Sequence, residues 1–144
     1  MKKNTKGFTL IELLAVIVIL AIIALIATPI VLNLINTARK GAAARSAEGI
    51  RASLKTQYFA NQVENPNAPI EPVKVDFTNA KEDTPITEYG VTLGQIIDGK
   101  LPKAGEVTIS TDGKVSTTAG KKLLIDGYYC SFADTQSATC TTES

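Results

Sequence analysis

Glu12 is the first side chain in the sequence that could do chemistry, because it is a carboxylate at the start of a long apolar run. Residues 13–27 are 15 consecutive apolar residues, and a lone charge beside lipid costs on the order of a kcal/mol or more, depending on depth. A neighbouring cation would remove much of this penalty, so Glu12 predicts a cationic partner. The alternative is that Glu12 lies in the first turn of its own helix, where the helix dipole favours an acid.

Cys130 and Cys140 are the second candidate group, and both lie within the last 15 residues. The sequence contains no histidine, which excludes Ser-His-Asp and Cys-His catalysis and removes the commonest ligand from any metal site. Two thiols without histidine do not complete a four-ligand zinc site, and no glycine pattern makes a phosphate cradle. We therefore predict no catalytic residue, no metal site and no cofactor.

The element that must hold Glu12 in place is an apolar helix. Apart from Glu12, Thr28 and Pro29, every residue in the range 10–32 is apolar. These 23 residues give roughly 34 Å of helix at 1.5 Å per residue, enough to cross a hydrocarbon core of ~30 Å. No Ala-x-Ala cleavage pattern follows Ala27 before the chain turns polar, so the stretch differs from a secretory signal peptide.

The residues on either side of this helix predict its orientation. Three lysines precede it without an acid, which fits a cytoplasmic N-terminus and places the long C-terminal part outside; they are Lys2, Lys3 and Lys6. In that outer compartment we expect Cys130 and Cys140 to form one disulfide around nine intervening residues. A free, structural pair of thiols is the alternative.

The start of the chain resembles the N-terminal signature of type IV pilins and the related pseudopilins. It reads Lys6-Gly7-Phe8-Thr9-Leu10-Ile11-Glu12, and Pro29 stands where family members commonly have a helix-kinking proline. The resemblance covers residues 6–29. It implies that a prepilin peptidase cuts between Gly7 and Phe8 on the cytoplasmic side and methylates the new amine of Phe8. It also implies that Glu12 meets the Phe8 ammonium of a neighbouring subunit, so that charge sets the register of assembly.

The resemblance also implies domains, partners and location. The chain would comprise a leader peptide (1–7), a transmembrane and filament-core helix (8–34), and a globular head (35–144) that includes the amphipathic half of the helix. The precursor would cross the inner or cytoplasmic membrane once, and an assembly platform and a cytoplasmic ATPase would lift it into an extracellular homopolymer. The net charge is +1, or +1 − 3 = −2 without the leader lysines, so no nucleic-acid signature is present.

We predict an α+β fold in which a long N-terminal helix, membrane-spanning in its first half and amphipathic in its second, packs on a small antiparallel sheet. The expected buried stripe is Ile35, Ala38, Ala42, Ala47 or Ser46, Ile50, Leu54 and Tyr58. Prolines end the helix near residues 61–65. Pro29 and Gly41 weaken it, and by analogy with pilins we predict melting between them in a filament. The alternative is a continuous, gently kinked helix in the free subunit.

Short strands are expected after the helix. A period of two predicts strands within residues 73–77, 106–111, 114–117 and 122–132, joined in one sheet of three or four strands. Asp112-Gly113 predicts a hairpin turn, whereas Asp126-Gly127 is either a second tight turn or a bulge. Residues 79–89 are expected to form a loop. Thr92 is expected to cap a short helix that Gly99 stops.

The predicted function is structural: a pilin, polymerised after processing into a type IV pilus. In the family such filaments serve adhesion, twitching motility, DNA uptake or biofilm formation, and the sequence does not choose among these roles. Within the family, the alternative is a pseudopilin of a type II secretion or DNA-uptake system, which would be far less abundant. From another class, the alternative is a monomeric, signal-anchored surface-binding module with an uncut leader. The polar loop of residues 131–139 is a candidate surface contact, or simply a staple that protects the C-terminus.

Overall fold

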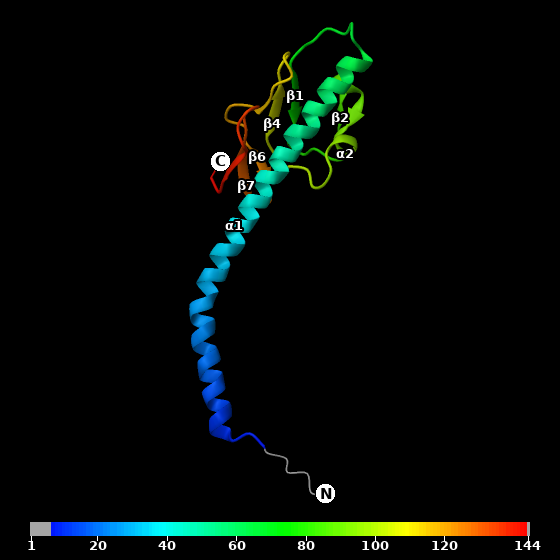
Figure 1. Ribbon diagram of the computed structural model, residues 1–144. Coiled ribbons are helices and arrows are strands. Elements are labelled where there is room, and N and C mark those ends of the chain that lie inside the picture. Colours follow the sequence, from blue (N-terminus) through cyan, green and yellow to red (C-terminus); the bar gives the residue numbers. More distant parts are fainter. Residues whose placement is uncertain (1–6, 144) are drawn as a thin grey trace, which may run out of the picture. The chain divides into compact units, whose positions relative to one another are not determined.

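The structure, a computed structural model, describes residues 7–143 (Figure 1). The leader lysines Lys2, Lys3 and Lys6 therefore lie outside the described residues. Helix α1 (Leu10–Glu64) begins the described chain and ends where the prolines predict. The chain divides into two compact units, Met1–Ala38 and Arg39–Ser144, and α1 contributes to both.

In the first unit, α1 is apolar and exposed on all sides. Among the described residues up to Ala38, every one except Ala27 is exposed. Leu20, near the middle of the apolar run, keeps 57% of its surface accessible. A helix with no polar face does not stay in water, so this stretch requires lipid or other helices around it.

In the second unit, α1 has one buried face. The buried residues recur every three or four positions: Ala43, Ala47, Ile50, Leu54 and Tyr58. The expected stripe is thus correct from Ala47 onward and wrong before it. Ala42 is exposed because Ala43 occupies the first contact of the stripe, while Ile35 and Ala38 belong to the exposed helix of the first unit.

Three small antiparallel sheets make up most of the second unit. The first has the order β1-β4-β5, the second is β2-β3, and the third is β6-β7-β8. The strands are β1 (Val73–Asp76), β2 (Pro85–Ile86), β3 (Val91–Thr92), β4 (Glu106–Ile109), β5 (Val115–Thr117), β6 (Leu123–Ile125), β7 (Tyr128–Ser131) and β8 (Thr139–Thr141). A 3-10 helix, η1 (Thr87–Tyr89), joins β2 to β3, and α2 (Leu93–Ile96) follows β3. The predicted fold class, a long helix on small antiparallel strands, is confirmed.

The prediction of a single sheet is wrong, because a turn separates β5 from β6. The Thr118 N–H donates to the Glu106 carbonyl at 2.9 Å. Within the turn, the Lys121 N–H donates to the Thr118 carbonyl at 2.9 Å. Gly120 adopts a φ of 76° within this turn. The strands after it therefore pair with each other, with Leu124 opposite Tyr129.

The hairpin turns follow the glycines. At Asp112-Gly113 the Ser110 N–H donates to the Lys114 carbonyl at 2.9 Å, as predicted. Gly113 has a φ of 77°, and a Cβ there would lie 2.8 Å from the Tyr58 ring, so both the backbone and the packing require glycine. Asp126-Gly127 joins β6 directly to β7 with both φ angles positive, so it is a tight turn and not a bulge.

The segment before α2 is more ordered than a loop. Residues 79–89 include β2 and η1, because Ile86 is buried and fixes this segment to the core. Thr92 caps α2 as expected, in a capping box with Gln95. The helix ends earlier than predicted, at Ile96, and the extended Ile97 caps it two residues before Gly99.

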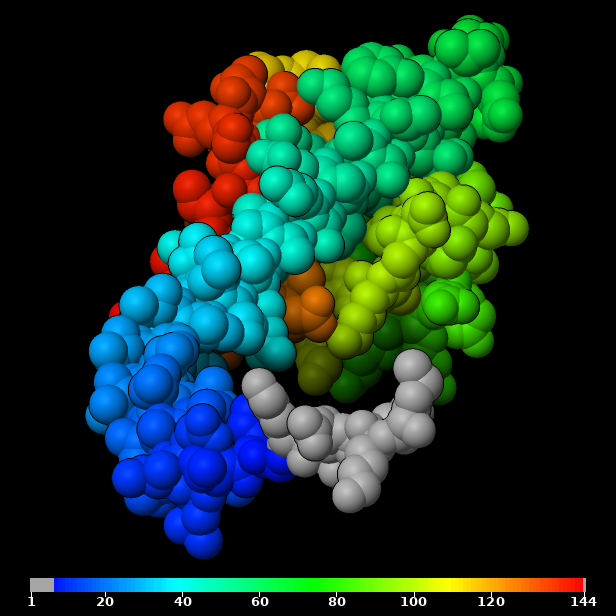
Figure 2. All heavy atoms as spheres, turned by 60° about the horizontal axis from the view of Figure 1, so that its bottom comes forward, coloured from blue at the N-terminus to red at the C-terminus, as the bar shows by residue number. Residues whose placement is uncertain are grey.

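The buried apolar side chains of the second unit form one cluster. Its largest fully buried members include Leu54 of α1, Phe77 after β1, Leu93 of α2, Ile109 of β4 and Leu123 of β6. Figure 2 shows α1 of this unit (cyan to green) between the C-terminal segment (red) and the segment around α2 (yellow-green). The head half of α1 therefore contributes one buried face to this core.

Candidate processing and assembly site

The predicted cleavage position lies in an accessible stretch just before α1. Residues 7–9 are not helical, and Phe8 is 90% exposed. A Cβ added at Gly7 would meet nothing within 4 Å. The fold of this chain therefore places no demand for glycine at this position, and any such demand comes from a partner that binds the segment.

Thr9 and Glu12 form a reciprocal capping box at the start of α1. The Thr9 N–H donates to Glu12 Oε2 at 2.8 Å, and the Glu12 N–H donates to Thr9 Oγ1 at 3.3 Å. The first helical bond runs from the Leu13 N–H to the Thr9 carbonyl. In the single chain, Glu12 thus lies in the first turn of its own helix and satisfies backbone donors there. This contact fixes the carboxylate at the point where the apolar run begins.

Pro29 and Gly41 do not interrupt α1 in the single chain. The Thr28 hydroxyl donates to the Ala24 carbonyl at 2.6 Å, one turn before the proline, and the helix continues to Glu64. Gly41 is exposed, with nothing near its Cα that a side chain would touch. The continuous helix was the expected alternative for the free subunit, whereas melting in a filament stays a prediction.

Within the described part of the chain, α1 is the helix long and apolar enough to cross a membrane. Basic residues flank its apolar run on both sides, three in the leader and three beyond it: Arg39, Lys40 and Arg45. Counting lysine and arginine alone therefore does not orient the helix, because the three leader lysines are balanced by the three basic residues beyond the run. An apolar signal sequence near an N-terminus passes the same test of length and composition, so the residues that precede the helix have to distinguish the two.

Residues 2–28 match the family described as the prokaryotic N-terminal methylation motif. The chain carries the prepilin signal of type IV pilins and pseudopilins. The prepilin signal includes Gly7, Phe8 and Glu12 and ends just before Pro29. It implies processing by a prepilin peptidase and an assembly machinery of the general pilus type, and it indicates a structural protein. No curated protein and no solved structure matches the chain.

The prepilin signal and the apolar helix fit a membrane-anchored precursor. The match spans less than a fifth of the chain, so it describes the anchor and leaves the second unit to be understood from its own contacts. No group of three or more metal-ligating side chains occurs among residues 7–143. The contacts that set this unit apart lie at its C-terminus.

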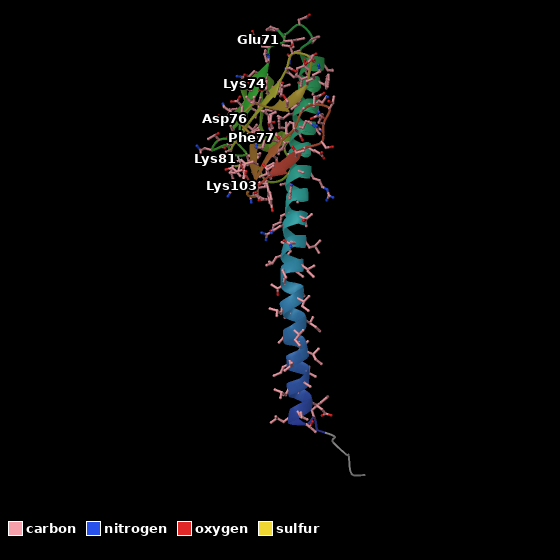
Figure 3. All side chains as sticks on the ribbon, turned by 90° about the vertical axis from the view of Figure 1, so that its left-hand side faces the viewer. Glu71, Lys74, Asp76, Phe77, Lys81 and Lys103 are labelled. Carbon is pink, nitrogen blue, oxygen red and sulfur yellow. A yellow bond between two sulfur atoms is a disulfide. The ribbon has the colours of Figure 1, made fainter. Side chains whose placement is uncertain are left out.

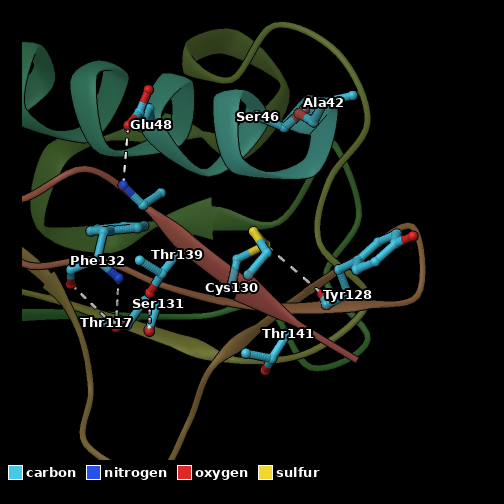
Figure 4. Close-up of a disulfide and its surroundings, with 12 residues drawn as sticks. Ala42, Ser46, Glu48, Thr117, Tyr128, Cys130, Ser131, Phe132, Thr139 and Thr141 are labelled. Atoms are coloured by element: carbon cyan, nitrogen blue, oxygen red, sulfur yellow. Dashed lines mark hydrogen bonds between the residues drawn. A yellow bond between two sulfur atoms is a disulfide. The ribbon is translucent and has the colours of Figure 1, made fainter. Parts of the chain in front are cut away.

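Cys130 and Cys140 form a disulfide with an S–S distance of 2.00 Å (Figure 4). They are register partners in β7 and β8, so the bond closes the hairpin loop of residues 131–139. Closing a loop of this length stabilises the folded chain by about 2–3 kcal/mol in the chain-entropy picture. Both sulfur-bearing residues are buried in the core cluster.

Three charged residues of α1 hold the same loop from the helix side. Arg51 Nη1 donates to the Ala133 carbonyl at 2.7 Å and to the Gln136 carbonyl at 2.5 Å. Its guanidinium also lies 5.7 Å from the centre of the Phe132 ring. Glu48 Oε1 accepts from the Ala138 N–H at 3.1 Å, a contact marked in Figure 4. The loop is therefore fixed along its length and not only at its two cysteines.

Asp134 is the charged residue at the centre of this attachment. Lys55 Nζ lies 2.8 Å from Asp134 Oδ1, and the Val115 N–H donates to the same oxygen at 3.2 Å. The hydrogen bond from Lys55, followed by that from Val115, lowers the pKa of the Asp134 carboxyl. These contacts were not predicted from the sequence, although Glu48, Arg51 and Lys55 repeat at the three-to-four spacing of the buried stripe. These contacts favour the staple over the free contact loop.

Proposed function

We propose that this chain is a structural subunit of a type IV pilus, cut by prepilin peptidase and polymerised into an extracellular filament. The observation that carries the proposal is the combination of the N-terminal methylation motif with a helix that exposes aliphatic side chains on every side. Such a helix needs lipid as a precursor and other helices as a product. A polymer of this chain with itself supplies those helices.

Glu12 would select the register of this polymer. When helices leave lipid for one another, burial of apolar surface gains little, so packing and polar contacts must choose the alignment. A cleaved neighbour would bring the Phe8 ammonium to the Glu12 carboxylate, and a buried ion pair is favourable only in good geometry. The hydrogen bond from Thr9 would hold the Glu12 carboxylate in position until the Phe8 ammonium of a neighbour pairs with it.

The same observations apply to a pseudopilin of a secretion or DNA-uptake system, which would carry the same signal. The two differ in quantity, because a major pilin is made in large excess. A monomeric surface-binding module would keep the aliphatic surface of the first unit in lipid, so that surface alone does not separate the module from a pilin. Such a module would also retain its leader.

The intact mass of the protein from its native host tests the proposal. We expect a mass that lacks residues 1–7 and carries one added methyl group on the Phe8 amine. Gly7→Val is the matched variant, since no neighbour constrains this position and the fold should be unchanged while the leader is retained. A full-length, unmethylated mass for the native protein would overturn the proposal in favour of the anchored module.

A further inference from the structure

The C-terminal end of α1 in the second unit has an uncompensated negative charge. The last turn contains Glu64 and no basic residue, although a helix C-terminus favours cations. Residues 56–73 contain two acids and no lysine or arginine. Glu71, on the segment just beyond α1 (Figure 3), is exposed and forms no ion pair with another described residue.

A hollow of about 370 Å³ lies at this end of the helix. Its wall includes the rings of Tyr58 and Tyr89, the amides of Asn61 and Asn65, and the carboxylates of Glu71 and Glu88. The wall contains no basic residue. Lys74 shares a neighbouring hollow with Glu88, but no ion pair joins these two.

The hydroxyl of Tyr89 adds a second, independent sign of a polar occupant. It is shielded from solvent and has no hydrogen-bond partner among the described residues. Burial raises the pKa of Tyr89 to about 12, so the group stays a neutral phenol whose oxygen can accept an N–H. Buried hydroxyls normally have a partner, so the hollow is suited to a donor that the single chain does not supply.

The other end of the same unit has the opposite charge. Arg39 and Lys40 are exposed and form no hydrogen bond or ion pair with the described residues. No acid occurs between residues 13 and 47, so the helix around them is purely basic. The charge of Arg39 helps to lower the pKa of Asp126, but the carboxylate of Asp126 is already paired with Lys100 at 2.9 Å.

We propose that Arg39, with Lys40 beside it, enters the acidic hollow of a second copy of this chain. This proposal rests on the proposed function, since it names a contact within that polymer. A guanidinium stacks on tyrosine rings and donates to carboxylate and amide oxygens, which are the groups that the hollow presents. Its N–H groups would also reach the Tyr89 hydroxyl once the side chains that now shield this oxygen move aside.

The contact joins two different surfaces of the chain, so it is head-to-tail and each new copy presents it again. Arg39 and Asn61 are 22 residues apart, which corresponds to roughly 33 Å along α1 at 1.5 Å per residue. Two heads in contact would be displaced by about this distance, and head-to-tail pairing builds an open filament wherever the rotation between copies does not close a ring. Other occupants of the hollow fit less well. An anion would be repelled by the carboxylates of Glu71 and Glu88, and a neutral group would not compensate the negative charge at the C-terminal end of α1.

Charge reversal in the full chain, expressed with its processing and assembly machinery, tests the contact. The acidic-end variant is Glu71→Lys with Glu88→Lys, and the basic-end variant is Arg39→Glu with Lys40→Glu. The combined variant carries all four changes, and Lys81→Glu is a control for reversal of an exposed charge elsewhere. We expect each single-end variant to reduce filament yield at least about tenfold, and the combined variant to return to within about threefold of the unchanged protein.

A combined variant that assembles no better than the single-end variants would overturn the proposal, as would single-end variants with normal yield. If only the basic-end defect appears and is not rescued, Arg39 and Lys40 bind something else, such as anionic lipid headgroups, and the contact is again rejected. A shift of the disulfide-bonded band on reduction checks that each variant has folded. Failure of the unchanged protein to form any polymer would instead reject the proposed function.

Discussion

The two halves of α1 share one continuous backbone but differ in what their apolar side chains touch. In the first unit, the aliphatic side chains cover every side of the helix and remain exposed. In the second, five residues at three-to-four spacing are buried in a core that the same chain provides. The comparison teaches that the apolar stripe in one half of the helix is covered by the chain's own head. The apolar surface of the other half can be covered only by other molecules.

Charged residues differ between the halves in the same way. Before residue 39, Glu12 is the one charged residue in α1, and its side chain accepts a hydrogen bond from Thr9, one turn before it. Beyond residue 39, Glu48, Arg51 and Lys55 reach segments more than 70 positions away. Polar groups in the head half therefore fix a tertiary fold, whereas the single acid of the first half has its hydrogen bonds within the first turn of its own helix.

Leucine truncation should have its largest effect in the head half. Leu54 is fully buried, so Leu54→Ala should lower the free energy of unfolding by about 2–5 kcal/mol. Leu20→Ala is the matched control, since its side chain is largely exposed and the change should stay within about 0.5 kcal/mol. Urea denaturation of the full chain in detergent micelles, followed by tyrosine fluorescence, measures both. If both changes lowered the free energy of unfolding equally, the two halves of α1 would not differ in their contribution to the fold.

The sequence predicted the elements better than their association. The apolar run, the helix end before the prolines and the Asp112-Gly113 turn follow from local rules of hydropathy and backbone conformation. Periodicity located the stripe from Ala47 onward but missed its first position, because the place where the head begins to cover the helix is a tertiary property. The division into separate sheets likewise depends on hydrogen bonds within a polar turn.

The candidate sites divide along the same line. Gly7, Phe8 and Glu12 stand in a contiguous motif, so the sequence alone could identify them. The attachment of the C-terminal loop joins α1 to residues some 80 positions later, and nothing local marks Asp134 as the partner of Lys55. Even so, charged residues that follow the spacing of a buried stripe are a usable sign of long-range polar contacts.

Glu12→Ala should separate insertion from assembly. Without the carboxylate, the apolar helix still enters the membrane, but the polymer loses the ion pair that would choose its register, so we expect filament yield to fall about tenfold. Glu48→Ala is the control from the other half, since it removes one contact to the C-terminal loop and should leave filaments intact. Membrane fractionation and electron microscopy of sheared filaments give the two readouts. Normal filaments from Glu12→Ala would contradict the register role.

Acid should loosen the attachment of the C-terminal loop through Asp134, with a smaller effect. Lys55 and the Val115 N–H lower the pKa of this carboxyl below its ordinary value of 3.8, so folding favours its ionised form. The stabilisation is therefore complete above that ordinary value and is lost as the pH falls through the lowered one. Asp112 and Glu106 also have lowered pKa values, so the loss of stability of the whole head in acid includes their contributions. Comparison with Asp134→Asn isolates the contribution of Asp134. Hydrogen-exchange protection of the Val115 amide should be higher in the unchanged protein than in Asp134→Asn at pH 6, and the two should converge as the pH falls through the lowered pKa of Asp134. A difference that persists unchanged at acid pH would show that the Asp134 charge does not hold the loop, leaving the disulfide and Arg51 as its attachments.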